Sequence, residues 1–327
     1  MFSISPLRIQ TIIVAIAVLI FSIKISAWYM TQSNAILTDA LESIVNIVAG
    51  TFSLYSLYLS GKPKDKDHPY GHGKIEFIAA TVEGTLIAVA GLGMILKCII
   101  DLEKPYEVTR LDFGLVLICI SAVLNYGLGW WMISQGTNQK SIPLTAGGKH
   151  LQIDAYTSIG LIAGLVLIRI TGYNALDAVI AIVLGILILF SGFKIVRSSV
   201  GGIMDETDPS LMNTILEILR TNRKDNWIDL HNLRAIRYGN KYHIDAHITL
   251  PWYYTLQQAH GSIQLIETII ETNLNTSTEV FFHMDPCIER SCNICPLKEC
   301  NVRLHPFIQR KEWTLDNIMM NQKHHLE

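Results

Sequence analysis

The sequence predicts a membrane protein: an all-α domain of six transmembrane helices, followed by a small α+β domain and a cysteine-rich tail. Half of the 327 residues are hydrophobic and only 17% are charged, whereas a soluble domain usually carries about 25% charge. The hydrophobic residues are concentrated in long runs before residue 200, and the composition becomes mixed after Asp205. Four of the six cysteines lie within fourteen residues near the C-terminus.

The composition also excludes several classes of protein. A formal net charge of −2 argues against a strongly basic nucleic-acid binder. Six cysteines in a chain of this length are too sparse for a disulfide scaffold. The sequence contains neither G-x-S-x-G nor H-E-x-x-H, and it has no glycine-rich phosphate loop, so an enzyme is a poor hypothesis.

Six apolar stretches each approach the roughly 20 residues that a membrane-spanning helix needs. They cover residues 9–30, 35–59, 75–102, 111–134, 145–170 and 175–199, within a transmembrane domain of residues 1–205. Nine basic residues lie near the span ends on one side, namely Arg8, Lys62, Lys64, Lys66, Lys74, Lys140, Lys149, Lys194 and Arg197, against Lys97, Lys104, Arg110 and Arg169 on the other. This bias places both termini in the cytoplasm and predicts an integral protein of the cytoplasmic (inner) membrane.

Residues 206–286 have the pattern of a small cytoplasmic α+β domain with the order α-β-β-α-β, as in ferredoxin-like folds. The expected elements are a helix at 209–222, strands at 228–238 and 242–250, a helix at 256–274 and a strand at 278–284. The turn pair Gly239–Asn240 separates the first two strands. Residues 287–327 form a separate tail, whose final residues we expect to be poorly ordered.

Polar residues inside the predicted spans are candidate functional groups, because burying them in a bilayer is costly. The second span contains Asp39, Glu42 and Asn46, and the fifth contains His150 and Asp154. A spacing of four places Glu42 with Asn46, and His150 with Asp154, on one face of each helix. Two such pairs would supply the four nitrogen and oxygen ligands of a divalent transition metal site. Alternatively, each group satisfies a neighbouring helix by hydrogen bonding.

The loop between the second and third spans contains a second candidate metal site. Asp65, His68 and His72 fall within eight residues, which is enough to hold a metal with water or one further ligand. The alternative is a solvated cytoplasmic turn whose lysines provide the positive-inside charge.

Residues 9–286 resemble the cation diffusion facilitator family of divalent metal efflux transporters. The resemblance is carried by six spans, the His150-x-x-x-Asp154 pair, the Asp65-x-x-His68-x-x-x-His72-Gly-x-x-Glu76 loop and a His-rich C-terminal domain. It implies a homodimer in the lipid bilayer, with Glu42, Asn46, His150 and Asp154 as the transport site and Asp65, His68 and His72 as a loop site. It also implies cytoplasmic metal sites at His231, His247, His260, His283 and Asp285, and a charge interlock between Lys74 and Asp205. The alternative for these histidines is a polar strand face.

The second-span pair departs from the family pattern, which usually has Asp or His followed by Asp. Glu42 still offers an anionic oxygen, but Asn46 offers only a neutral carbonyl. The metal could be zinc, iron, cobalt, nickel or manganese, since all bind nitrogen and oxygen ligands of this kind.

Cys287, Cys292, Cys295 and Cys300 form the pattern C-x4-C-x2-C-x4-C. In a cytosolic segment this density favours a metal site over disulfides. Four thiolates suit structural zinc, and the first spacings are also compatible with an iron–sulfur cluster.

The hypothesis for function is efflux of a divalent metal by alternating access, driven by exchange for protons. The rival hypothesis is a membrane-anchored metal sensor whose Cys/His domain signals without transport. Ionisable groups at mid-membrane favour transport, because an anchor does not need them.

Overall fold

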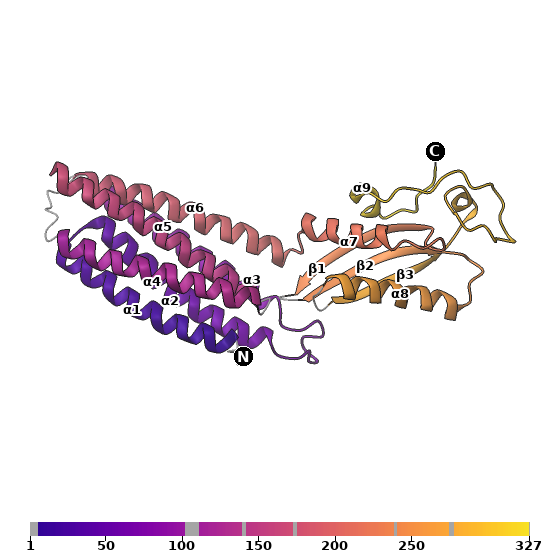
Figure 1. The fold of residues 1–327 in the computed structure, drawn as a ribbon, viewed down its shortest axis with the longest axis horizontal. Coiled ribbons are helices and arrows are strands. Elements are labelled where there is room, and N and C mark those ends of the chain that lie inside the picture. Colours follow the sequence, from indigo (N-terminus) through magenta and orange to yellow (C-terminus); the bar gives the residue numbers. More distant parts are fainter. Residues whose placement is uncertain are drawn as a thin grey trace. The chain divides into compact units, whose positions relative to one another are not determined.

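The computed structural model describes residues 6–101, 111–138, 142–172, 175–238, 241–274 and 278–326. The chain divides into two compact units, Met1–Met204 and Asp205–Glu327. Helices α1–α6 make up the first unit, and a three-stranded sheet with its helices makes up the second (Figure 1). The turn pair Gly239–Asn240, and the charges Lys104, Arg110 and Lys140, lie outside the described residues.

All six predicted spans are helices. They are α1 (Pro6–Thr31), α2 (Asn34–Ser60), α3 (Ile75–Asp101), α4 (Leu111–Asn138), α5 (Ile142–Thr171) and α6 (Ala175–Ile203). Each is long and apolar enough to cross a membrane. The prediction of a six-helix membrane domain is therefore confirmed.

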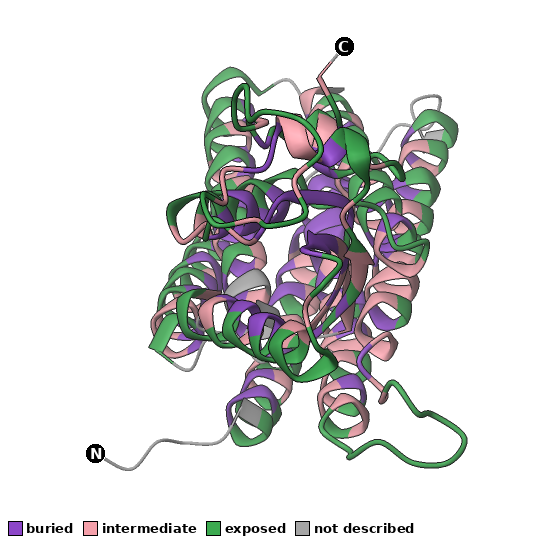
Figure 2. Cartoon of the chain, turned by 90° about the vertical axis from the view of Figure 1, so that its right-hand side faces the viewer, coloured by how far each residue is buried: buried purple, intermediate pink, exposed green. Residues whose placement is uncertain are grey.

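The membrane helices turn large apolar side chains outward. Ile170 is 77% exposed and Val123 is 72% exposed, and buried and exposed residues alternate around the helices (Figure 2). Such an apolar exterior suits lipid, because the backbone polar groups are satisfied within each helix.

Glycines bring particular helices into backbone contact. A Cβ atom on Gly192 of α6 would lie 2.7 Å from the carbonyl oxygen of Gly84 on α3. One on Gly148 of α5 would lie 2.8 Å from the carbonyl oxygen of Gly129 on α4. Small residues of this kind let membrane helices approach closely. The helix pairs α3–α6 and α4–α5 are accordingly the most extensively packed in the first unit.

The second unit has the predicted order of elements. It contains α7 (Pro209–Thr221), β1 (Asp229–Tyr238), β2 (Lys241–Leu250), α8 (Leu256–Leu274) and β3 (Thr278–Pro286). β1 pairs antiparallel with β2, and β2 pairs parallel with β3. The parallel pair requires a crossover, which α8 supplies, and Ile244, Ile266 and Leu216 pack between the sheet and the helices. The expected α+β fold is confirmed.

The prediction that the final residues are poorly ordered was wrong. After a short 3₁₀ helix at Glu289–Asn293, the chain packs back onto the sheet and forms α9 (Leu315–Ile318). Trp313 is 1% exposed and packs beneath the guanidinium of Arg223, 3.8 Å from the ring centre. The tail thus contributes apolar side chains to the core of the second unit. The polar composition of the tail gave no indication of this packing.

Candidate functional site

Helices α2 and α5 bring three of the four predicted transport-site residues into direct contact. The Asn46 amide donates to Oδ2 of Asp154 over 2.6 Å, and its Oδ1 lies 3.1 Å from Nε2 of His150. Nε2 of His150 is 3.8 Å from Oδ1 of Asp154. Asp154 is 1% exposed, and its Oδ1 has no hydrogen-bond partner among the described residues. The cluster therefore holds a buried acceptor that a cation could satisfy.

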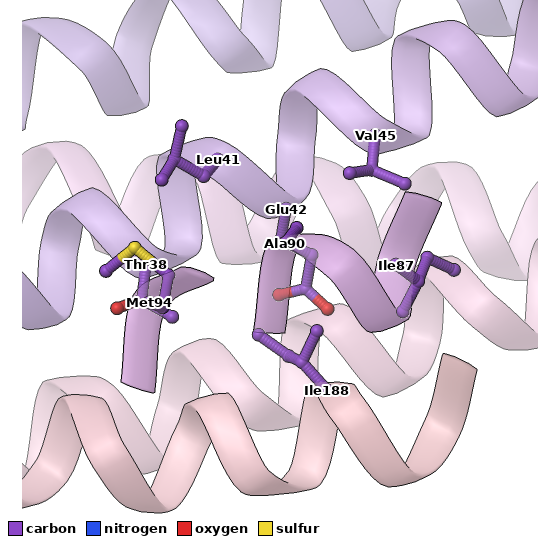
Figure 3. Close-up of a pocket in the computed structure, with 8 residues that line it drawn as sticks. All are labelled: Thr38, Leu41, Glu42, Val45, Ile87, Ala90, Met94 and Ile188. Carbon is purple, nitrogen blue, oxygen red and sulfur yellow. The ribbon is translucent and has the colours of Figure 1, made fainter. Parts of the chain in front are cut away.

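Glu42, the fourth predicted residue, lies one turn along α2 from Asn46. Its side chain lines a small cavity, together with Ile87 of α3 and Ile188 of α6 (Figure 3). A carboxylate among aliphatic side chains is costly to keep ionised. In this arrangement Glu42 is beside the His150–Asp154 cluster rather than part of its hydrogen-bonded core.

Sequence reasoning missed Lys24, which lies in the C-terminal half of the first span. Its ammonium group is 2.8 Å from Oδ1 of Asp39, and both side chains are buried. Ser158 donates to the same Oδ1 over 3.2 Å. The lysine itself was a usable signal, because a lysine inside an apolar run needs a partner. Its partner lies on another helix, which sequence spacing does not reveal.

The loop residues Asp65, His68 and His72 lie together as expected. One oxygen of Asp65 is 3.1 Å from Nδ1 of His68, and the other is 3.3 Å from Nε2 of His72. One ligand atom from each residue lies within 4.8 Å of the others. The backbone N–H of His68 donates to Asp65, and mainly for this reason the pKa of the Asp65 carboxyl is lowered. The turn thus presents an ionised oxygen beside two imidazoles.

Strand register brings part of the predicted C-terminal cluster together. His231, His247 and His283 are paired in one row across β1, β2 and β3. Oδ2 of Asp285 is 3.2 Å from Nε2 of His231 and 3.1 Å from Nδ1 of His247. These three form a group with ligand atoms within 4.8 Å. His283 is 4.0 Å from Asp285, and the exposed His260 on α8 is outside the group.

The tail adds contacts around this cluster that the sequence did not indicate. His324 binds Asp229 twice, through its backbone N–H and through Nδ1, each over 2.8 Å. Asp229 is in turn 3.5 Å from Nδ1 of His231. A carboxylate behind a metal-ligating imidazole orients the ring. Lys323 donates to the carbonyl of Pro286 and is 3.4 Å from Oδ1 of Asp285.

Replacing Asp229 with asparagine should destabilise the second unit and release the tail. Burial alone raises the pKa of Asp229, but hydrogen bonds from His231 and His324 outweigh it and lower the pKa to about 2. Ionised Asp229 therefore stabilises the fold fully above pH 3.8, the ordinary pKa of its carboxyl group. This stabilisation is lost as the pH falls toward about 2. At neutral pH the substitution of Asp229 by asparagine should lower the free energy of unfolding of the second unit by about 2 kcal/mol.

Chemical unfolding measures this cost, and hydrogen exchange of residues 321–326 measures the release. Asp225→Asn is the matched control, because Asp225 is exposed and pairs with Arg310 on the surface. Equal losses in both variants would show that Asp229 has no special role.

The four tail cysteines do not form a closed cluster in the part of the chain that the structure describes. Cys295 is buried, and Cys287 accepts a hydrogen bond from the Trp252 N–H over 3.4 Å. Arg303 donates to the carbonyls of Cys292, Cys295 and Leu297, which fixes the loop backbone. Among the residues that the structure describes, no three of the sulfur atoms lie within 4.8 Å of one another. Binding of a single ion by all four would require the sulfur atoms to move closer together.

Metal binding by these cysteines should strengthen as the pH rises, and should keep strengthening past 9.0, the ordinary pKa of a thiol. Burial raises the pKa of Cys287 and of Cys295, and a metal must displace the thiol protons. Cobalt titration followed by thiolate charge-transfer absorption tests this, with Cys287→Ser as the variant that should lose affinity. A pH-independent affinity would contradict it.

The predicted charge interlock would pair Lys74 with Asp205. The amino group of Lys74 donates to the carbonyl of Ile203 within the first unit, over 3.5 Å, and Asp205 begins the second unit. The Lys74–Asp205 pair stays a prediction.

Six apolar helices that are long enough to span a bilayer, with polar and ionisable side chains packed between them, define an integral membrane protein. Family models agree with this class. The cation efflux transmembrane domain matches residues 11–204, and the cation efflux protein cytoplasmic domain matches residues 208–287. The chain therefore belongs to the cation efflux (cation diffusion facilitator) family of divalent metal cation transporters, and is a transporter rather than an enzyme.

Individual relatives support the same assignment. An uncharacterized transporter of Synechocystis sp. is 30% identical over 281 residues, which is 86% of this chain and 90% of the relative. The cation-efflux pump FieF of Salmonella arizonae is 28% identical over 280 residues, 84% of this chain and 90% of the pump. Metal tolerance protein C1 of Arabidopsis thaliana is 28% identical over 319 residues, 90% of this chain and 66% of that protein.

Proposed function

We propose that this chain exports a divalent transition metal from the cytoplasm in exchange for protons, and that the cargo binds between α2 and α5. The observation that carries the proposal is the contact of Asn46 with both His150 and Asp154, at 3.1 and 2.6 Å. These residues offer an imidazole nitrogen, a carboxylate and an amide oxygen, which are ligands for a divalent transition metal. Glu42 adds a second negative charge one turn away.

Proton exchange follows from the chemistry of these ligands. A metal binds only a neutral imidazole and ionised carboxylates, so its arrival releases protons. The cargo would bind Oδ1 of Asp154, which has no hydrogen-bond partner among the described residues, beside the Oδ2 atom that accepts from Asn46. On the far side of the membrane, protons returning to His150 and Asp154 weaken the hold on the cargo. The proton gradient thereby drives export.

Zinc is the favoured cargo, because one imidazole and carboxylate oxygens suit it well. Iron, cobalt, nickel and manganese remain chemically compatible with the same ligands. Asn46 supplies no charge, so the site binds its cargo with fewer negative ligands than a pair of acidic residues on α2 would give.

The C-terminal domain regulates transport in this proposal. It forms a homodimer, and metal held by His231, His247 and Asp285 stabilises the dimer when the cytosol is rich in metal. The loop residues Asp65, His68 and His72 hold a further ion at the membrane surface, and the tail cysteines hold a structural zinc. Both termini lie in the cytoplasm, which the positive-inside bias of the loops supports.

Metal flux in proteoliposomes tests the proposal. Purified protein is reconstituted with a metal-sensitive dye inside the vesicles, zinc is added outside, and a pH gradient is applied. Zinc accumulation that requires the gradient and stops when a protonophore is added is the expected result. Saturable zinc binding without flux would instead identify a membrane-anchored sensor.

A further inference from the structure

A buried ion pair lies one helical turn beyond the proposed cargo site. The ammonium group of Lys24 on α1 is 2.8 Å from Oδ1 of Asp39 on α2, and Lys24 is 0% exposed. A charge buried to this extent is costly, and removing its partner leaves the other charge uncompensated. The proposed transport mechanism does not use this pair.

Helix α2 carries both Asp39 of the ion pair and Glu42 and Asn46 of the cargo site. Asp39 lies three residues before Glu42 on α2, and both line one small cavity together with Thr157 of α5. Ser158, which donates to Asp39 over 3.2 Å, lies one turn after Asp154. Lys24 interacts electrostatically with Glu42 and Asp154 as well as with Asp39. The pair is therefore part of the electrostatic environment of the cargo.

Asp39 has a free acceptor. Its Oδ2 atom is buried and has no hydrogen-bond partner among the described residues. Metal binding requires ionised carboxylates, and in that state Asp39, Glu42, Asp154 and Lys24 together carry a net charge of −2. This net charge balances one divalent cation. Without Lys24, Asp39 would be a buried carboxylate with no counter-charge next to the cargo site.

We propose that Lys24 is a positioning residue for transport, a tethered cation that holds Asp39 away from the cargo and sets the charge of the site. This inference rests on the proposed transport function. Lys24 does not touch the cargo; it acts through Asp39. Its effect is to keep binding weak enough for release, since an additional unpaired carboxylate would strengthen the hold on a divalent ion.

Zinc transport kinetics in proteoliposomes test this role with four variants. Lys24→Met should lower KM by about tenfold and also lower kcat, because a unit charge acts strongly on a divalent ion at the low dielectric constant of the site. Asp39→Asn should raise KM by about tenfold for the opposite reason. The double variant Lys24→Met/Asp39→Asn restores the charge balance, so its KM should return close to the parent value. Lys24→Arg keeps the charge and should keep the parent KM.

The opposite KM shifts separate this role from a structural one. If Lys24 only supported the fold, both single variants would lose kcat without opposite KM shifts, and the proposal would be overturned. If Lys24→Met fails to fold, an unchanged KM in Asp39→Asn overturns it, and a raised KM that the double variant reverses supports it. Failure of the transport proposal would look different, because the parent itself would then show no gradient-driven zinc flux.

Discussion

Replacing Asp154 with asparagine should abolish gradient-driven metal transport, lowering kcat/KM by about 100-fold or more. Asp154 is buried, and it supplies the only carboxylate that contacts Asn46 among the described residues. Asparagine has nearly the same shape but has no charge and does not exchange a proton. The variant would therefore lose both an anionic ligand for the cargo and a site for the returning proton. Initial rates of zinc uptake in proteoliposomes measure the loss.

Asp112→Asn is the matched control for this substitution. Asp112 begins α4 on the surface of the same unit, where it pairs with Arg169 over 2.7 Å while remaining 69% exposed. The identical chemical change there should leave the transport rate within about twofold of the parent, since surface ion pairs contribute little. Transport by Asp154→Asn at a rate close to that of Asp112→Asn would refute the assignment of the cargo site.

Valine at Gly192 should destabilise the membrane domain by roughly 3 kcal/mol or more. A Cβ atom at this position would lie 2.5 Å from the backbone nitrogen of Ala88 and 2.7 Å from the carbonyl oxygen of Gly84. Both neighbours are backbone atoms, which cannot rotate away as a side chain could. Helices α3 and α6 would have to separate along their length, with loss of the packing between them. Thermal unfolding of the detergent-solubilised protein measures the effect.

Gly93→Val provides the comparison. Gly93 is also on α3, but a Cβ atom there meets nothing within 4 Å. The added side chain should face open space and change the melting temperature little. Similar melting temperatures for the two variants would mean that close approach of α3 and α6 is not important for stability.

Most of the fold could be predicted from the sequence, because hydropathy identifies each spanning helix by itself. All six spans were found, and the structure extends several of them by a few residues at the ends. The elements of the C-terminal domain were found in the same way, through alternating or helical periodicity. The packing of the tail could not be predicted, because only isolated side chains such as Trp313 and Ile318 reach the core and they form no periodic pattern.

The candidate sites could be predicted only where the ligands share one element or one loop. The spacing of His150 with Asp154 places both on one face of α5, and the Asp65 loop closes on itself. Sequence spacing does not show which residues of different helices meet, so the pairing of Lys24 with Asp39 could not be predicted. The contact of Asp229 with His324 spans 95 positions, which local patterns cannot reveal. That any of these groups binds metal stays a prediction.

The glycine contacts determine which helices can slide past one another. Backbone contact at Gly129 and Gly148 locks α4 to α5, so His150 and Asp154 must move together with α4. By contrast, α2 meets α5 sparsely, and the polar bridges between them run from Asn46 to Asp154 and from Ser158 to Asp39. The first of these bridges lies at the proposed cargo site, where an ion held by Asn46 and Asp154 would also join the two helices. Occupancy of the proposed cargo site would therefore act directly on the contact between α2 and the packed α4–α5 pair, which would couple ion binding to helix motion.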